Sequence, residues 1–408
     1  MKRIVFVAPP FAGHFNPLLV LANAARGAGY QTEFITGPRK IAAAERNGHR
    51  AIAPRSIGMD ALEAIANTSE PVRSNPFRLL AQFRENMRLL PAIGDELVER
   101  WQGERPELVV ADSVAPIAGL AAERLGIRWI TTAATPITIE TRRGIPSYCG
   151  GWMPGSPLRD AAGRAAIRAF KQSVGLLFRE EFRRLGLRGV YREDGSEAIY
   201  SPYAILGFGI SELEFERDWP SHFQMLGPMF ASPGDAAPFA FDEPRPRVLV
   251  THGTHLLWAK RTLFDEVCAL SDAMPHVHFV VSYGNPDSAA PARAGRVRAV
   301  PFLDYEQHLD GFDAVIHHGG TGIAYATISA GLPCIAVPRD YDQFYYAARL
   351  EYHGLGLRSK AIANAAPLLT RILDRSQWPA LERFRAYARA YTPAATFLET
   401  VKRLSQSL

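Results

Sequence analysis

The sequence predicts an α/β protein of two doubly wound (Rossmann-like) domains that face each other across a cleft. The chain of 408 residues is too long for one ordinary hydrophobic core and suits two domains of roughly 200 residues. In each half, short apolar runs alternate with stretches of helical periodicity, which is typical of parallel sheets covered by helices. Between the halves, residues 227–247 are rich in proline and have the composition of a linker.

The first half opens with a predicted βαβ unit. Residues 4–8 form a short apolar run typical of a buried parallel strand. We expect a loop up to Phe15, after which Asn16 and Pro17 supply the N-cap and the first residue of a helix. The remaining elements expected in this half are strands at 32–36, 108–111 and 129–132, helices at 75–101 and 116–125, and loops and helices at 142–192 inserted over the cleft.

A second series of strands follows the linker, at 248–251, 279–282, 314–317 and 334–337. This order divides the chain into a first domain (1–227), a linker (228–246) and a second domain (247–390). The remaining residues, 391–408, are expected to form a C-terminal helix that can cross back to the first domain.

Composition narrows the class of protein. Hydrophobic residues make up 47% and charged residues 21%, as in ordinary globular proteins, and the net charge of +5 is too small and too scattered for a nucleic-acid-binding surface. The three cysteines lie far apart, which favours a reducing compartment. The apolar run at 4–8 is too short for a signal peptide, and no stretch approaches the roughly 18 apolar residues that span a bilayer. We therefore expect a cytoplasmic protein without an integral membrane segment.

The most informative motif is HHGGTG, from His317 to Gly322. It leads from a predicted strand into a predicted helix at 323–329, which ends at Gly331. Glycines allow a ligand to approach the backbone, and the free amides of a helix N-terminus attract phosphate oxygens. His318 can add a hydrogen-bond donor. The motif indicates a diphosphate site, and the alternative is a tight turn whose glycines only satisfy packing.

A second polar loop follows the next predicted strand and contains Asp340, Asp342 and Gln343. Carboxylate and carboxamide groups suit sugar hydroxyls, and the carboxyl ends of parallel strands meet at one edge of the sheet. The sequence Asp340-Tyr341-Asp342 also matches the DxD pattern of metal-dependent transferases. A helix N-terminus can offset the charge of a departing diphosphate without a metal, so we expect no metal site.

With HHGGTG, AGLP and VPRDYDQ in this order, the sequence resembles the family 1 glycosyltransferases of GT-B fold over nearly its whole length. Residues 13–17 (GHFNP) look like the first-loop motif of that family, and 251–254 look like the first loop of its second domain. The resemblance implies a UDP- or dTDP-linked sugar as co-substrate, a small-molecule acceptor and no cofactor. It also implies that residues 1–227 form the acceptor-binding domain and residues 247–390 the nucleotide-sugar-binding domain. The HHGG turn looks closer to bacterial transferases for lipids, carotenoids or antibiotics.

The resemblance also implies which residues bind the donor. Loop and turn residues would contact the diphosphate, an aromatic ring would stack on the base, and the Asp-Gln pair would hold the transferred sugar. The residues concerned are Gly253, Thr254, Phe302, His318, Gly319, Gly320, Thr321, Gly322, Ile323, Asp342 and Gln343.

Four positions depart from the pattern of the family. Asp304 and Tyr305 replace its Pro-Gln beside the base, which leaves uracil and thymine open. Ala326 stands where many members bind ribose with Glu, and Ile323 replaces a Ser or Thr, which leaves only the amide of that residue for phosphate.

His14 is the predicted general base. An alcohol is a poor nucleophile near neutral pH, and histidine has a pKa suited to accept its proton. His14 lies at the end of the first strand, just before the predicted helix, so its ring should project into the cleft. Asp112, at the end of the strand at 108–111, can fix the tautomer of His14 and stabilise its imidazolium form. The alternative for both residues is a helix-capping role.

Aromatic and apolar side chains of the first half are expected to line the acceptor site, which suggests an apolar or aromatic acceptor. These candidates are Phe11, Phe15, Phe83, Met87, Trp152, Met153 and Phe178.

The sequence thus predicts an inverting, metal-independent hexosyltransferase. A sugar-nucleotide epimerase of the same architecture and a non-catalytic partner protein of GT-B fold are the alternatives, and a dehydrogenase is disfavoured because no GxGxxG motif is present. The sugar, the base, the acceptor and the oligomeric state stay open.

Overall fold

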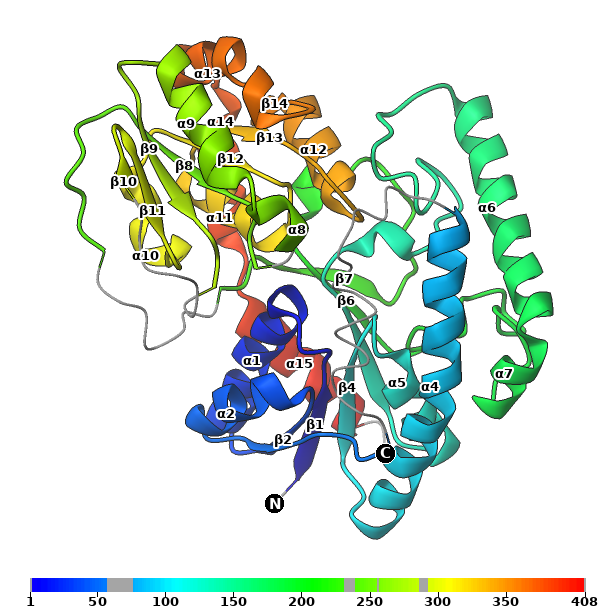
Figure 1. Ribbon diagram of the computed structural model, residues 1–408. Helices are drawn as coiled ribbons and strands as arrows, with labels where there is room; N and C mark the ends of the chain where they lie inside the picture. Colours follow the sequence, from blue (N-terminus) through cyan, green and yellow to red (C-terminus); the bar gives the residue numbers. More distant parts are fainter. Residues whose placement is uncertain (1, 57–75, 231–238, 255–256, 286–292, 407–408) are drawn as a thin grey trace.

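A computed structural model describes residues 2–56, 76–230, 239–254, 257–285 and 293–406. Two seven-stranded sheets, each flanked by helices, lie one above the other (Figure 1). All strand pairs of the first sheet are parallel, and in the second only the edge strand is antiparallel. The predicted fold class is confirmed.

The first sheet has the order β3-β2-β1-β4-β5-β6-β7. Its strands are β1 (Arg3–Val7), β2 (Gln31–Ile35), β3 (Arg50–Ile52), β4 (Leu108–Asp112), β5 (Trp129–Ala133), β6 (Ile205–Phe208) and β7 (Phe223–Gly227). The helices of this half are α1 (Ala12–Gly27), α2 (Pro38–Arg46), α4 (Pro76–Gly103), α5 (Pro116–Arg124), α6 (Pro157–Leu177) and α7 (Arg179–Arg184).

The second sheet has the order β10-β11-β9-β8-β12-β13-β14. Its strands are β8 (Arg247–Thr251), β9 (His278–Ser282), β10 (Arg293–Ala294), β11 (Val297–Val300), β12 (Ala314–His317), β13 (Cys334–Ala336) and β14 (Gly356–Arg358). The helices of this half are α8 (Leu257–Lys260), α9 (Leu263–Ala273), α10 (Tyr305–His308), α11 (Thr321–Ala330), α12 (Gln343–Tyr352), α13 (Ala366–Leu373) and α14 (Ala380–Ala390).

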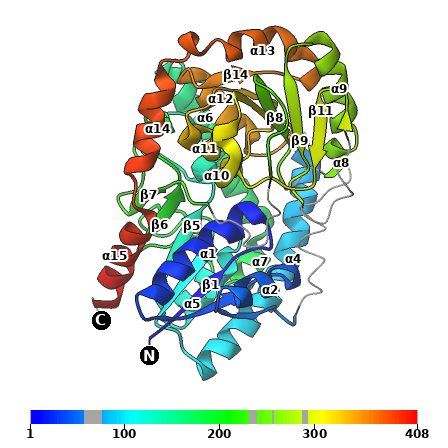
Figure 2. The same cartoon turned by 90° about the vertical axis from the view of Figure 1, so that its left-hand side faces the viewer.

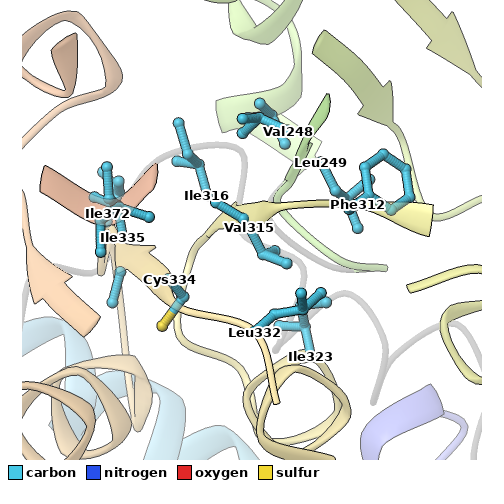
Figure 3. Packing of buried hydrophobic residues seen from close by; sticks show 14 of the residues in the cluster. Val248, Leu249, Phe312, Val315, Ile316, Ile323, Leu332, Cys334, Ile335 and Ile372 are labelled. Atoms are coloured by element: carbon cyan, nitrogen blue, oxygen red, sulfur yellow. The ribbon is translucent and has the colours of Figure 1, made fainter. Parts of the chain in front are cut away.

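Buried aliphatic side chains hold each sheet to its helices. In the second half, Val248, Val315 and Ile335 of three neighbouring strands are fully buried, and Figure 3 shows them together with Ile323 of α11. Consecutive apolar residues fit this position because a parallel sheet is covered on both faces. The core therefore fixes the strand ends, from which the loops of the site extend.

The last helix, α15 (Pro393–Gln406), lies against the first half. Phe397 and Val401 are buried in the same core as Phe6, and the rings of Phe6 and Phe397 are 6.1 Å apart. The end of the chain therefore crosses from the second sheet to the first, as the red helix beside α1 shows (Figure 1).

One predicted helix start is wrong. Helix α1 begins at Ala12 and not at Pro17, which lies inside the helix. Pro17 is the sixth residue of α1, so it removes one intrahelical hydrogen bond, and the helix continues past it. His14 consequently lies in the first turn of α1, and Asn16 is not the N-cap. Of the described helices, none is long and apolar enough to cross a bilayer.

Candidate active site

His14 and Asp112 are in contact. The Nδ1 atom of His14 lies 2.9 Å from Oδ1 of Asp112, which also accepts a hydrogen bond from the Val114 amide at 2.8 Å. Asp112 ends β4, the strand beside β1, so the sheet brings two residues 98 positions apart to one edge. The Asp112 side chain is fully buried, whereas 24% of the His14 side chain is exposed. The carboxylate favours the tautomer with a proton on Nδ1, which leaves the Nε2 lone pair of His14 free to accept a proton.

The surroundings raise the pKa of His14 above its ordinary value. Burial lowers this pKa, but the charge of Asp112, its hydrogen bond to the ring and the charge of Asp342 together outweigh that effect. Asp342 belongs to the second half of the chain, and its negative charge is close enough to influence the ring. The Asp342 carboxylate of the second half therefore lies within electrostatic range of the His14 imidazole of the first half.

The predicted diphosphate turn forms the start of α11. Gly320 precedes the helix, and the ring of His318 fits between two glycines. A Cβ atom on Gly253 would lie 2.6 Å from Cε1 of His318, and one on Gly320 would lie 2.4 Å from its Nε2. Gly253 also has a φ of +67°, which side-chain-bearing residues rarely adopt. Glycine is therefore required at both positions for this imidazole to lie against the turn.

Helix α11 presents its N-terminal amides toward the first half. The hydroxyl of Thr321, its first residue, lies 3.1 Å from that of Thr135 in the first half, and Figures 1 and 2 both show α1 below α11. The side chain of Ile323 is buried in the core of the second half, so only its amide is available to a ligand. Helix α11 ends before Gly331, which has a φ of +66°, and this confirms the predicted end of the helix.

Asp342 is linked to the first half by a hydroxyl that the sequence analysis missed. Thr135, just beyond β5, donates to the Asp342 carboxylate, and the Thr321 hydroxyl lies 3.4 Å from the same oxygen. Tyr346 of α12 donates to the Ala134 carbonyl at 3.1 Å. Burial raises the pKa of Asp342, although the Thr135 hydrogen bond and the charge of His14 act against it. The sequence does contain one signal for Thr135: it is a polar residue just after a predicted strand, and ligands of such sheets bind beyond the carboxyl ends of the strands.

Gln343 is arranged differently from Asp342. Its side-chain oxygen accepts hydrogen bonds from the backbone amides of Arg339 at 2.7 Å and Asp340 at 3.0 Å, so this oxygen stabilises the loop that precedes α12. Only the amide nitrogen of Gln343 is left for a sugar hydroxyl. Thr254, at the start of the facing loop, is exposed.

The segment expected to contact the nucleobase follows β11. Phe302 is half-buried, and Asp304 caps α10 by accepting from the amides of Glu306 and Gln307. The Tyr305 hydroxyl lies 3.1 Å from that of Thr251, which in turn accepts from the Gly253 amide at 3.0 Å. Asp304 and Tyr305 therefore stabilise this segment and connect it to the glycine loop.

The expected acceptor-lining residues fall into three groups. Phe15, Met87 and Phe178 are packed in the hydrophobic cores of the first half, so their assignment to the acceptor site is corrected. Phe11 is half-buried with its ring 6.3 Å from that of His14, and Trp152 and Met153 lie in the loop before α6. The side chain of Phe83 lies outside the described residues. An apolar side chain gives no local sign of whether it faces a core or a pocket.

Comparisons with known proteins find glycosyltransferases. Residues 278–379 match the family model of the erythromycin biosynthesis protein CIII-like C-terminal domain. A zeaxanthin glucosyltransferase of Pseudescherichia vulneris is 27% identical, covering 91% of this chain and 89% of its own. A 4'-demethylrebeccamycin synthase of Lentzea aerocolonigenes is 26% identical, covering 88% and 87%.

Solved structures share the fold along the whole chain. The glycotransferase of kitacinnamycin superposes with a TM-score of 0.76 at 19% identity and covers 99% of both chains. The glycosyltransferase SsfS6 of Streptomyces sp. SF2575, complexed with thymidine diphosphate, has a TM-score of 0.68 at 20% identity and covers 98% of this chain and 99% of its own. The chain is thus a glycosyltransferase of GT-B fold that is similar along nearly its whole length to transferases of natural products.

Proposed function

We propose that this glycosyltransferase moves a hexose or deoxyhexose from a UDP- or dTDP-sugar to a hydroxyl of a small, apolar or aromatic acceptor, with inversion at the anomeric carbon. The observation that carries the proposal is the hydrogen bond between His14 and the buried Asp112, together with the effect of the Asp342 charge on the pKa of His14. A general base from one half thus meets a sugar-binding carboxylate from the other.

In this reaction Nε2 of His14 accepts the proton of the acceptor hydroxyl, whose oxygen attacks the anomeric carbon from the face opposite the diphosphate. The bond from that carbon to the phosphate oxygen breaks, and its electron pair leaves with the nucleotide diphosphate. Asp112 stabilises the imidazolium ion that results. The amides at the start of α11 stabilise the charge on the departing diphosphate, since a helix N-terminus favours anions.

The donor assignment rests on the turn around His318 and on relatives. The thymidine diphosphate complex of SsfS6 supports a dTDP-sugar, while the half-buried Phe302 offers a ring to either pyrimidine base. Asp342 would exchange its hydrogen bond from Thr135 for one from a sugar hydroxyl, and the Gln343 amide nitrogen could donate to a second hydroxyl.

Apolar side chains near the paired His14 and Asp112 support an apolar or aromatic acceptor. Val114, two residues after Asp112, is 53% exposed, and Phe344, next to Gln343, is 38% exposed. The loop of Gly151 and Trp152 meets Phe344, because a Cβ on Gly151 would lie 3.5 Å from that of Phe344. Val114 and Phe344 are therefore candidates for lining the acceptor site in place of the buried Phe15, Met87 and Phe178.

The test is nucleotide diphosphate release from UDP- and dTDP-sugars, with and without a panel of aromatic and polyene alcohols. We expect release that depends on the acceptor, with a glycoside of inverted configuration as the product. Release of nucleotide in the absence of any acceptor would favour an epimerase or a hydrolase. No release with any donor, although the diphosphate raises the melting temperature, would favour a non-catalytic partner protein.

A further inference from the structure

Helix α6 has its polar and apolar sides reversed. Its two buried residues are charged, Asp160 and Lys171, whereas its large apolar residues face outward. Leu158 is 84% exposed, Phe170 61% and Leu176 76%, and the five alanines between Leu158 and Phe170 are exposed as well. A helix on the surface of a globular protein normally turns its apolar side inward. The outer face of α6, from Leu158 to Leu177, is therefore apolar surface without cover among the described residues.

The inward-facing charges are satisfied within the fold. Lys171 pairs with Glu197 and lies 3.1 Å from a carboxylate oxygen of Glu140, and Asp160 accepts from the guanidinium of Arg159. The pairs of Lys171 with Glu197 and Glu140 fix the orientation of α6, because rotating the helix would leave the buried Lys171 without partners. The apolar outer face is consequently a fixed feature of the folded protein.

The residues around this face carry a net positive charge larger than that of the whole chain. From 142 to 192 there are eleven Lys and Arg residues and three Asp and Glu residues, a net charge of +8, while the whole chain has +5. Arg179, Arg183 and Arg184 follow directly after the exposed Leu176 and Leu177, and all three are exposed. Figure 1 shows α6 and α7 together along the outer edge of the molecule, on the right.

We propose that the outer face of α6, with the arginines of α7, docks this protein on the surface of an anionic lipid bilayer. Helices that lie in a bilayer interface combine exposed Leu and Phe side chains with basic residues that attract anionic headgroups. Charge complementarity favours a lipid surface over a second copy of this chain as the partner of this face. A second copy would bring another strongly positive segment against the first, whereas anionic lipids neutralise both.

Docking would hold the acceptor side of the enzyme near the bilayer. The loop that precedes α6 contains Gly150 and Gly151, which lie against Tyr345 and Phe344 at the start of α12. An acceptor dissolved in the membrane would therefore reach the cleft from the side on which the protein is anchored. The docking proposal does not depend on the identity of the acceptor.

Co-sedimentation of the full-length protein with vesicles tests the proposal. We expect binding to vesicles of phosphatidylglycerol and phosphatidylcholine (1:1) that is at least about tenfold stronger than binding to phosphatidylcholine alone, and that weakens as salt rises. Replacing two bulky side chains, Phe170→Ser with Leu176→Ser, should weaken binding by about tenfold or more. Arg183→Gln with Arg184→Gln should weaken it by about fivefold per arginine at low salt.

Matched substitutions elsewhere serve as controls. Tyr352→Ser removes an apolar residue that is 54% exposed, and Arg371→Gln with Arg389→Gln removes two exposed arginines of the second half. Neither should change vesicle binding, and circular dichroism should show every variant folded. Equal binding to both kinds of vesicle, or unchanged binding of the Phe170 and Leu176 variant, overturns the proposal. A dimer seen by light scattering that this variant dissociates also overturns it, and assigns the face to a second copy.

Discussion

Replacing Asp112 with asparagine separates the charge of this residue from its geometry. The Oδ1 atom of Asp112 accepts from both His14 Nδ1 at 2.9 Å and the Val114 amide at 2.8 Å. In Asp112→Asn the amide oxygen can keep both bonds. The new NH2 group then takes the place of Oδ2, which has no hydrogen-bond partner among the described residues. The variant therefore removes the negative charge while the ring of His14 stays in position.

The size of the effect follows from the loss of a charge-assisted bond. A hydrogen bond to a charged group contributes about 1–2 kcal/mol more than a neutral one, which corresponds to a rate lower by roughly 5- to 30-fold. The pKa of His14 should fall as well, because Asp112 provides both a charge and a hydrogen bond that raise it while burial lowers it. A general base must be neutral, so activity is lost as the pH falls through this pKa. The acid limb of the kcat/KM profile should therefore move to lower pH in Asp112→Asn.

The assay is nucleotide diphosphate release between pH 5 and 9, with Ser113→Ala as the neighbouring control. Titration of the His14 ring by NMR gives the pKa independently of turnover. A variant with the wild-type rate and an unshifted acid limb would show that Asp112 does not act through His14. A loss far above 30-fold would show that the amide had turned and stabilised the wrong tautomer of the ring.

Two further substitutions test the donor turn and the contact between the halves. Gly320→Ala places a Cβ 2.4 Å from Nε2 of His318, so we expect the affinity for the donor to fall by about tenfold or more in a thermal-shift titration. In the control Gly103→Ala the new Cβ meets no atom within 4 Å, and the affinity should stay unchanged. Equal affinity in both variants would contradict the assigned position of His318. The Glu214 carboxylate accepts a hydrogen bond from Tyr345 and lies 3.1 Å from Nε of the fully buried Arg349. Glu214→Gln removes this charge, so the free energy of unfolding should fall by about 3–5 kcal/mol. The control Glu216→Gln changes an exposed residue and should lower it by about 0.5 kcal/mol or less. Urea denaturation measures both, and matching losses would contradict the role of this ion pair.

Local patterns in the sequence predicted the strands and turns that carry the site. The run before HHGGTG gives β12, and the glycine after it ends α11, because both signals lie within a few residues of the structure that they determine. The predicted start of α1 was wrong because Asn16-Pro17 is a strong local signal for a helix start. The residue at the true N-cap position, just before Ala12, makes no side-chain hydrogen bond to the helix and so gives no such signal. Strands β6 and β7 were not predicted, since their apolar runs are short and the insertion at 142–192 separates them from β5.

Contacts between the two halves of the chain, and the choice of which helix face meets a sheet, could not be predicted. Thr135 bonds to Asp342 across 207 positions, and nothing near Thr135 indicates that partner. The burial of Phe15 and Phe178 likewise depends on which helix face meets the sheet, which hydrophobicity alone does not determine. The pairing of His14 with Asp112 was predictable because adjacent parallel strands place their carboxyl ends together.

The central claim, that His14 takes the acceptor proton opposite the donor turn, is tested most directly by single-turnover measurements on His14→Ala with saturating nucleotide sugar. We expect the chemical step to slow by about 10²–10⁴-fold, while the affinity for the nucleotide diphosphate stays within about twofold of the wild type. An alanine variant that transfers sugar at the wild-type rate would contradict the account.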